Sequence, residues 1–147
     1  MANYECTIRS NFFHVKDVEE FREFMRHVHS LEGFINLFEK VDESGRITFS
    51  FGTYGPIFGY VNGADEENED FDADIAYDAF VNGLQRYVAE DDAVIIAEAG
   101  NEKLRSVVGT VLVITNSDTK YLDIWEIAVE TARKILKNVN YNTEYEE

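Results

Sequence analysis

Residues 34–51, FINLFEKVDESGRITFSF, carry the local signal that decides the fold. Two runs of strand-forming residues, 34–41 and 46–51, flank the polar sequence Asp42-Glu43-Ser44-Gly45. Aromatic and β-branched residues favour strands, and a short polar connection ending in glycine favours a tight turn. This stretch therefore predicts an antiparallel hairpin.

Helices are predicted on both sides of the hairpin. Asp17 and Glu20 have capping-box spacing, and apolar residues recur at helical intervals through residues 17–30. A second helix is predicted from about residue 74 to residue 89 by the same periodicity. A third helix is predicted to begin after Asp123, which has the residue type of an N-cap.

Strand-like segments complete the pattern, with a turn predicted at Gly100-Asn101. They cover residues 4–15, 93–98, 104–115 and 120–122, while the glycine-rich segment 52–63 is expected to be a structured loop or a short extra strand. Hairpins separated by helices predict an α+β two-layer sandwich, a mainly antiparallel sheet with three helices in the order βαββ-αββα. We expect one domain over residues 1–138 and a flexible C-terminal tail over 139–147.

The third predicted helix has a clear apolar face. Its members are Ile124, Ile127, Ala128, Ile135 and Leu136. In a sandwich whose helices share one layer, we expect this face to pack against the sheet.

Charge is concentrated in the middle of the chain. The 147 residues include 29 acidic and 13 basic side chains, which gives a net charge of -16. Residues 65–92 hold 11 of the acids and a single base, Arg86. Because excess negative charge repels a phosphate backbone, we expect no direct nucleic-acid binding.

No feature of the sequence predicts a membrane or secretory destination. No apolar run approaches the roughly 20 residues that a bilayer span needs. The first residues, Met1-Ala2-Asn3-Tyr4-Glu5, contain neither a basic nor an apolar leader region. We therefore expect a cytoplasmic protein that does not bind membranes.

Catalytic motifs are missing. The lone Cys6 has no second cysteine for a disulfide or zinc knuckle, and His27 and His29 fall on different faces of the predicted helix. Nothing in the sequence brings Cys6 and His14 together with a third group. Nucleotide-binding glycine loops and the nucleophile elbow are absent as well. We predict a protein that is not an enzyme and uses no cofactor.

One acidic pattern imitates the start of a calcium loop. Asp70, Asp72 and Asp74 have the D-x-D-x-D spacing, with Asp78 at the ninth position. The sixth position is Ile75 instead of glycine, and the twelfth is Val81 instead of glutamate, which excludes an EF-hand. We predict no metal site, although weak Ca²⁺ or Mg²⁺ binding and a merely solvated acidic loop remain alternatives.

A concentrated acidic surface is suited to a basic groove on another protein, and basic grooves are usually nucleic-acid sites. Aromatic side chains near such a surface would supply packed anchors for a long-lived complex. The sequence thus predicts a nucleic-acid mimic that binds a basic nucleic-acid-binding protein, either a nuclease or an effector complex. The predicted contacts are Asp65, Glu66, Glu67, Glu69, Asp70, Asp72, Asp74 and Asp78, with Tyr54, Phe58, Tyr60 and Trp125 as anchors. An edge-of-core position for Trp125 is the alternative.

Two stretches carry a resemblance. SNFFHVKDVEEF (residues 10–21) and AEAGNEKLR (residues 97–105) are similar to small acidic proteins of mobile elements in Gram-positive bacteria. The resemblance implies a setting in which anti-CRISPR and anti-restriction inhibitors occur, and it transfers no functional residue.

Two other functions remain open. An immunity or antitoxin protein that neutralises a basic toxin nuclease would use the same electrostatics. A structural component that self-assembles through the aromatic residues 54–60 would instead associate independently of salt.

Overall fold

The computed structural model describes residues 4–31, 33–61 and 73–142. In this part of the chain the helices are α1 (Val18–Met25), α3 (Ala73–Tyr87) and α4 (Ile124–Leu136). The strands are β1 (Glu5–Ser10), β2 (Phe13–His14), β3 (Val28–Ser30), β4 (Gly33–Phe34), β5 (Asn36–Val41), β6 (Ile47–Tyr54), β7 (Ile57–Tyr60), β8 (Val94–Glu102), β9 (Ser106–Ile114) and β10 (Thr119–Asp123). The predicted α+β fold with three helices and a mainly antiparallel sheet is confirmed, and β2, β3, β4 and β7 add short strands to the predicted order.

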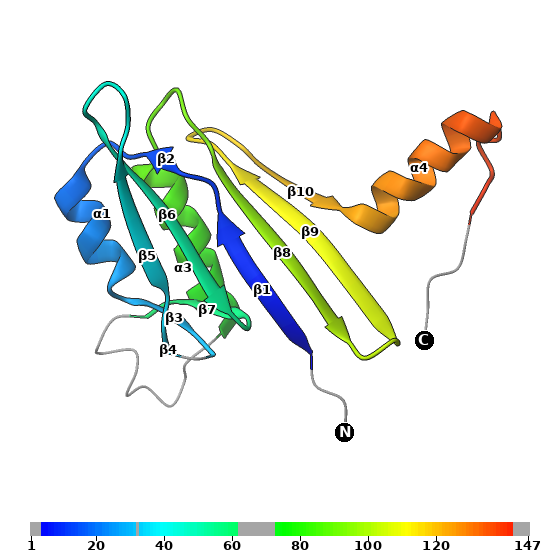
Figure 1. Cartoon of the computed structure of the whole chain (residues 1–147), viewed down its shortest axis with the longest axis horizontal. Coiled ribbons are helices and arrows are strands. Elements are labelled where there is room, and N and C mark those ends of the chain that lie inside the picture. The colour runs from blue at the N-terminus through cyan, green and yellow to red at the C-terminus, as the bar shows by residue number, and fades with distance from the viewer. Residues whose placement is uncertain (1–3, 32, 62–72, 143–147) are drawn as a thin grey trace.

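Seven of the described strands form one antiparallel sheet (Figure 1). Its order is β10-β9-β8-β1-β6, and β2 continues the line of β1 along the same side of β6. β5 pairs with the other side of β6. A second, three-stranded sheet joins β4, β3 and β7. The large sheet therefore ends at β5 on one edge and at β10 on the other.

The predicted hairpin is present as β5 and β6. Val41 lies opposite Ile47, and the Gly45 N–H donates to the carbonyl oxygen of Asp42 over 3.1 Å. Gly45 has a φ of 87°, a left-handed conformation that glycine adopts without steric cost. Turn chemistry and strand propensity agree here, which explains why the local sequence is sufficient to predict the hairpin.

The predicted helix over residues 17–30 is correct at its start and wrong at its end. Asp17 is the N-cap and accepts a hydrogen bond from the Glu20 N–H, but α1 ends at Met25. Residues 28–30 form β3 instead, because Val28 pairs with Tyr60 of β7 across the small sheet. A contact between segments this far apart in sequence overrides the local helical pattern.

The predicted turn at Gly100-Asn101 is also wrong. β8 runs on through both residues to Glu102, and the chain turns at Lys103, whose φ is 51°. Gly100 is required inside the strand, because a Cβ there would lie 2.6 Å from the Glu5 carbonyl oxygen. This glycine marks a close approach of two backbones and not a turn.

One face of the sheet is covered by α1 and α3. The fully buried aromatic rings between these layers are Phe13, Phe21, Phe49, Phe51 and Phe80. Phe21 of α1 lies 4.9 Å from Phe49 of β6 between ring centroids, and Phe80 of α3 lies 5.8 Å from Phe51. These contacts fix both helices to the same side of β6.

The third helix does not join this layer, so the expected packing of its apolar face is wrong. Ile124 contacts Gly109, because a Cβ added to Gly109 would lie 2.8 Å from the Cδ1 atom of Ile124. Gly109 lies opposite Ala99, which lies opposite Thr7, and this row belongs to the face away from α1 and α3. No residue of α4 is buried, and the helix projects past β10 (Figure 1).

Within the described residues, no helix combines the length and the apolar character that a membrane span requires.

After α4, the described part of the chain turns back toward the helix, where the Arg133 Nε atom donates to the Tyr141 carbonyl oxygen over 2.7 Å. The rest of the predicted tail, residues 143–147, lies outside the described part.

Candidate partner-binding surface

The predicted acidic contacts fall mostly outside the described residues. Six of them do so: Asp65, Glu66, Glu67, Glu69, Asp70 and Asp72. Asp74 lies in the first turn of α3, and Asp78 lies one turn later with an exposed side chain. The two positions are about 6 Å apart along the helix axis. The structure thus places the C-terminal end of the acidic segment, which we define as residues 65–78, on α3.

The orientation of α3 is set by its apolar positions. Ala76, Phe80 and Leu84 recur every four residues and are buried. Asp78 lies about 160° around the helix from the mean direction of these side chains, at about 100° per residue. Its carboxylate therefore points away from the sheet, on the outer surface of the helix layer.

Two close approaches hold α3 in place. A Cβ on Gly59 of β7 would lie 2.1 Å from the Ala76 carbonyl oxygen, and a Cβ on Gly83 would lie 2.2 Å from the Phe24 ring of α1. Residue 59 therefore has to be glycine, whereas a Cβ on Gly83 would require the Phe24 ring to shift. Through them, β7 lies against the first half of α3 and α1 lies against its second half.

The predicted aromatic anchors divide into two kinds. Tyr54 at the end of β6 and Phe58 in β7 are exposed. Tyr60 is half-buried and stacks on Phe24, with ring centroids 5.0 Å apart and an angle of 8° between the ring planes. Because β7 lies beside α3, Phe58 and Tyr60 belong to a strand next to the helix that carries Asp78.

Trp125 is not brought to this group. It lies in the first turn of α4, and its indole N–H donates to the Val107 carbonyl oxygen of β9 over 2.9 Å. β8 and β1 separate β9 from β6 in the sheet. The half-buried indole therefore anchors α4 to the sheet, away from Tyr54 and Phe58.

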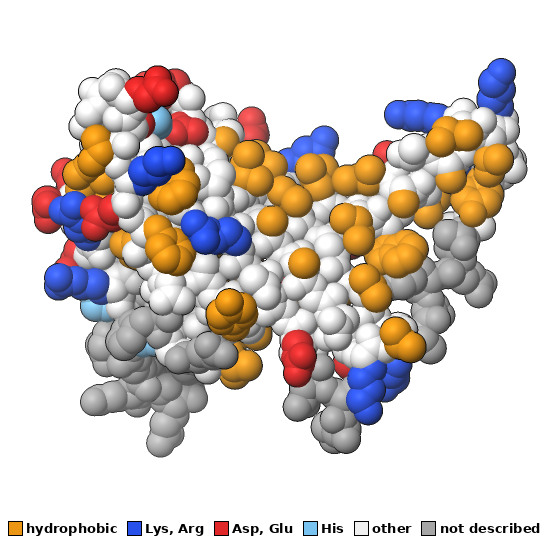
Figure 2. Space-filling view, in the orientation of Figure 1, with side chains coloured by type: hydrophobic (Ala, Val, Ile, Leu, Met, Phe, Trp, Pro, Cys, Tyr) orange, Lys and Arg blue, Asp and Glu red, His pale blue; other side chains and the backbone are white. Residues whose placement is uncertain are grey.

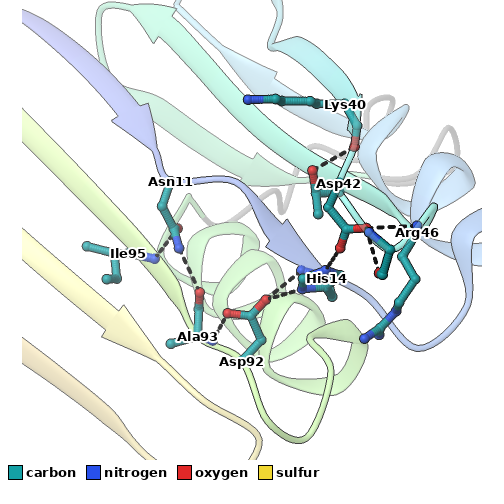
Figure 3. Close-up of polar contacts among 10 residues, drawn as sticks. Asn11, His14, Lys40, Asp42, Arg46, Asp92, Ala93 and Ile95 are labelled. Carbon is teal, nitrogen blue, oxygen red and sulfur yellow. Dashed lines mark hydrogen bonds and ion pairs between the residues drawn. The ribbon is translucent and has the colours of Figure 1, made fainter.

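Sequence reasoning missed a cluster at the opposite end of α3. His14 lies between Asp42, in the turn after β5, and Asp92, in the loop before β8 (Figure 3). Its Nε2 atom is 2.6 Å from an Asp42 oxygen, and its Nδ1 atom is 2.8 Å from an Asp92 oxygen. The His14 backbone N–H donates to the same Asp92 oxygen over 2.8 Å. These three residues, the His14 cluster, join three segments of the chain.

The His14 cluster is a charged arrangement. An ionised carboxylate only accepts hydrogen bonds, so both ring nitrogens donate and the imidazole is protonated. Hydrogen bonds to Asp42 and then to Asp92 raise the pKa of His14, although partial burial opposes them. Hydrogen bonds from His14 and Ser44 hold the pKa of Asp42 well below its usual range.

The pKa of Asp92 is lowered as well, but two opposing effects act on it. Burial acts to raise the pKa of Asp92, but hydrogen bonds from the His14 backbone and ring and from the Ala93 N–H outweigh burial and lower it. No local spacing signals this cluster, because His14 is 28 residues from Asp42 and 78 from Asp92.

The His14 cluster also gathers acidic side chains. Glu43 follows Asp42 in one loop, and Glu90 and Asp91 precede Asp92 in the other. The side chains of Glu43, Glu90 and Asp91 are exposed. We call residues 42–43 and 90–92 the acidic loops. In the described residues, Asp74 and Asp78 therefore lie in the first turns of α3 and the acidic loops lie beyond its end.

The possible catalytic pair of Cys6 and His14 does not form. Cys6 is buried beside Gly100 and lines a cavity of about 630 Å³ with Tyr4 and Leu31. Burial, followed by the charge of Glu98, raises the pKa of the Cys6 thiol, which makes it a weaker nucleophile at neutral pH. Among the described residues, no group of three or more histidine, cysteine, aspartate or glutamate side chains could hold a metal ion.

Comparisons of the chain with known proteins give no further guide to the function of this surface. No protein-family model, no curated protein and no solved structure matches it.

Proposed function

We propose that the protein is a non-enzymatic inhibitor that binds a basic nucleic-acid-binding site of a partner protein through its acidic side. The observation that carries the proposal is the distribution of carboxylates around α3. Residues 65–92 contribute a net charge of -10, with Arg86 as their only base. This segment includes the whole of α3, and Asp78 points outward from that helix.

The length of α3 gives the scale of the proposed contact. α3 has 15 residues and a length of about 22 Å. Along the chain, the acidic segment precedes this helix and the acidic loops follow it. Duplex DNA presents one charge per about 1.7 Å of its axis, and a basic groove shaped for it offers a matching row of cations.

Two of the three acids of α1 are less available. Glu19 and Glu23 of α1 pair with Arg22 and Arg26 on the same helix. Partial neutralisation of α1 favours α3 and the acidic loops as the contact surface. Exposed Tyr54 and Phe58 supply apolar contacts near the start of α3.

The test uses the purified full chain, immobilised and exposed to a Gram-positive bacterial lysate. We expect it to retain a basic protein that a duplex DNA oligonucleotide releases, since DNA and the inhibitor would compete for one site. Identification of that protein separates an effector complex or restriction nuclease from a toxin nuclease, which would indicate an immunity protein.

A charge-matched pair of variants makes this test specific. The first replaces Asp70, Asp72, Asp74 and Asp78 with asparagine, and the second replaces Asp118, Glu144, Glu146 and Glu147 with the corresponding amides. Only the first should lose the DNA-releasable partner. Equal retention by both variants, or a partner that DNA does not release, would refute the proposal.

A further inference from the structure

An apolar surface lies on the side of the sheet away from α1 and α3, which we call the open face. Strand register places Ala97, Val111 and Leu122 in one row and Ile95 and Val113 in the next. These side chains are exposed or half-buried. Figure 2 shows apolar side chains across this part of the molecule and on α4, with basic side chains beside them and acidic ones toward the margins. A contiguous exposed apolar surface of this kind marks an interaction site.

The apolar surface continues from the sheet onto α4. Ile124 contacts Gly109 of the open face, and Ile127 and Ile135 follow on the same side of the helix. Ile127 is 46% exposed and Ile135 is 75% exposed. We call Ile124, Ile127 and Ile135 the α4 stripe. Because β10 ends at Asp123 and α4 begins at the next residue, no linker allows the helix to fold back over its own sheet.

The charges on the open face are basic. Arg9 and Lys120 lie in the two apolar rows. Lys40 joins them from β5, since its Nζ atom lies 5.6 Å from the centre of the Phe12 ring and the Arg9 guanidinium carbon lies 6.0 Å from the same centre. All three cations are exposed, and none forms an ion pair with a described acid. By strand alternation, Glu5 at the start of β1 is the one described acid that shares this face.

The exposed side of α4 has the same sign of charge. Lys134 follows Ile127 by seven residues, so it lies about 20° from Ile127 around the helix. Glu126 and Glu130 lie more than about 100° from the centre of the α4 stripe. Because the open face and the α4 stripe are both apolar and both basic, their charges oppose contact between two copies and favour an acidic partner.

We propose that the open face and the α4 stripe bind an acidic amphipathic helix of another protein. The apolar side of that helix would lie on the two rows of the open face, as amphipathic helices do in apolar grooves. From β1 to β10 the sheet crosses three strand spacings, about 14 Å, which is close to three turns of helix. Carboxylates about three turns apart on the bound helix therefore reach Arg9 and Lys120 together.

The open face is less suited to a nucleic acid. Single strands bind largely by stacking their bases on aromatic rings. The Arg9 guanidinium already lies over the Phe38 ring at 4.4 Å from its centre, and Lys40 lies over Phe12. The side chains of the two rows are aliphatic, which favours a protein helix as the occupant.

This inference is independent of the proposed function, because the two use opposite faces of the sheet. The proposed function depends on the outer surface of α3, where Asp78 lies. At about 0.1 M salt, charges more than about 10 Å apart are largely screened. The cations of the open face therefore act on an acidic helix more strongly than the described acids of the helix layer do, and either interaction can fail without the other.

Peptide titrations followed by NMR of the isotope-labelled full chain test the inference. One probe is a synthetic amphipathic peptide of about 18 leucine, alanine and glutamate residues, a length at which helix formation is favourable. The other has lysine at every glutamate position. At about 0.1 M NaCl the glutamate peptide should shift resonances of Ala97, Val111 and Ile127 saturably, with a Kd below about 1 mM. The lysine peptide should leave these resonances unchanged and shift those near Asp78.

Variants locate the contact. Ala97→Glu places a charge in the apolar row and should weaken binding of the glutamate peptide at least about tenfold. Lys120→Gln combined with Lys134→Gln removes two exposed cations and should weaken it about threefold. Arg26→Gln combined with Arg86→Gln makes the same change of charge on α1 and α3 and should bind as wild type. Circular dichroism establishes that each variant is folded.

Two results would overturn the inference. One is the absence of saturable shifts on the open face with up to about 1 mM glutamate peptide, a concentration at which even weak specific contacts are populated. The other is equal affinity of the open face for both peptides. In either case, shifts of the same residues with a single-stranded oligonucleotide, with phosphatidylglycerol vesicles or with rising protein concentration alone would assign the surface to a nucleic acid, a membrane or a second copy.

Discussion

Gly59 of β7 lies so close to α3 that a Cβ on it would be 2.1 Å from the Ala76 carbonyl oxygen. Its φ of 134° is also one that residues with a Cβ rarely adopt. This contact positions α3 beside the exposed aromatic residues of β6 and β7. It therefore sets where Asp78 of α3 lies relative to those aromatic side chains.

Gly59→Ala should destabilise the protein by about 2 kcal/mol or more, because backbone strain and a clash with a fixed carbonyl act together. Gly45→Ala is the matched control, since Gly45 also has a positive φ but no atom lies within 4 Å of the place that a Cβ would occupy. It should cost about 1 kcal/mol from strain alone. Urea unfolding of the two variants compares these costs, and equal losses would mean that the Gly59–Ala76 contact is unimportant.

The His14 cluster should make stability depend on pH. Because the pKa of His14 is raised, the stability that His14 contributes is fully present below its ordinary pKa of 6.5. This stability is lost as pH rises through the raised pKa. Because the pKa values of Asp42 and Asp92 are lowered, the stability that they contribute is fully present above their ordinary pKa of 3.8. It is lost as pH falls through the lowered pKa values. The cluster therefore stabilises most between pH 3.8 and 6.5.

His14→Gln should lower the melting temperature strongly near pH 5 and less near pH 9, because the wild-type imidazole loses its proton as pH rises through its raised pKa. His27→Gln is the control, because it removes a histidine that lies outside the His14 cluster. A His14→Gln difference that is the same at both pH values would show that the imidazolium charge contributes nothing.

Trp125→Ala should loosen α4 without unfolding the core. The indole N–H bond to Val107 and the half-buried ring attach the helix to β9, and loss of the bond alone should cost about 1 kcal/mol. Hydrogen exchange should accelerate in α4 while β1 and β6 keep their protection. Trp125→Phe, which retains an apolar ring, should give an intermediate effect. Faster exchange throughout the sheet would instead identify Trp125 as a residue of the main core.

Calcium should have no specific effect. Asp74 and Asp78 follow one another along α3, and the predicted twelfth ligand position is Val81. Calorimetry in CaCl₂ and in NaCl at matched ionic strength should give the same melting temperature, because both salts only screen self-repulsion. A saturable one-to-one Ca²⁺ isotherm would contradict this and would indicate a metal site.

Elements with purely local determinants could be predicted from the sequence. Asp17 and Asp123 cap helices as expected, since a capping side chain bonds to N–H groups two or three residues away. The β5–β6 hairpin follows from its turn for the same reason. Local periodicity places Val28 in the wrong element because its partner, Tyr60, is 32 residues away.

The candidate site was less predictable than the fold. The acidic segment can be recognised in the sequence as a continuous run of acidic residues. The acidic loops are distant in sequence and are joined through the contacts of His14 with Asp42 and Asp92. The apolar periodicity of α4 predicts a helix correctly, yet it does not say whether the chain's own sheet or another molecule covers that helix. Such pairings depend on tertiary structure, which periodicity does not encode.

The association rate of the captured partner with three forms of the chain tests the central claim most directly. Wild type should bind fast at low salt and more slowly as salt rises, because steering by surface charge is screened. The variant with Asp70, Asp72, Asp74 and Asp78 replaced by asparagine should bind several-fold more slowly at low salt, with a shallower salt dependence. The control changed at Asp118, Glu144, Glu146 and Glu147 should follow wild type. An asparagine variant that binds at the wild-type rate in low salt would contradict the account.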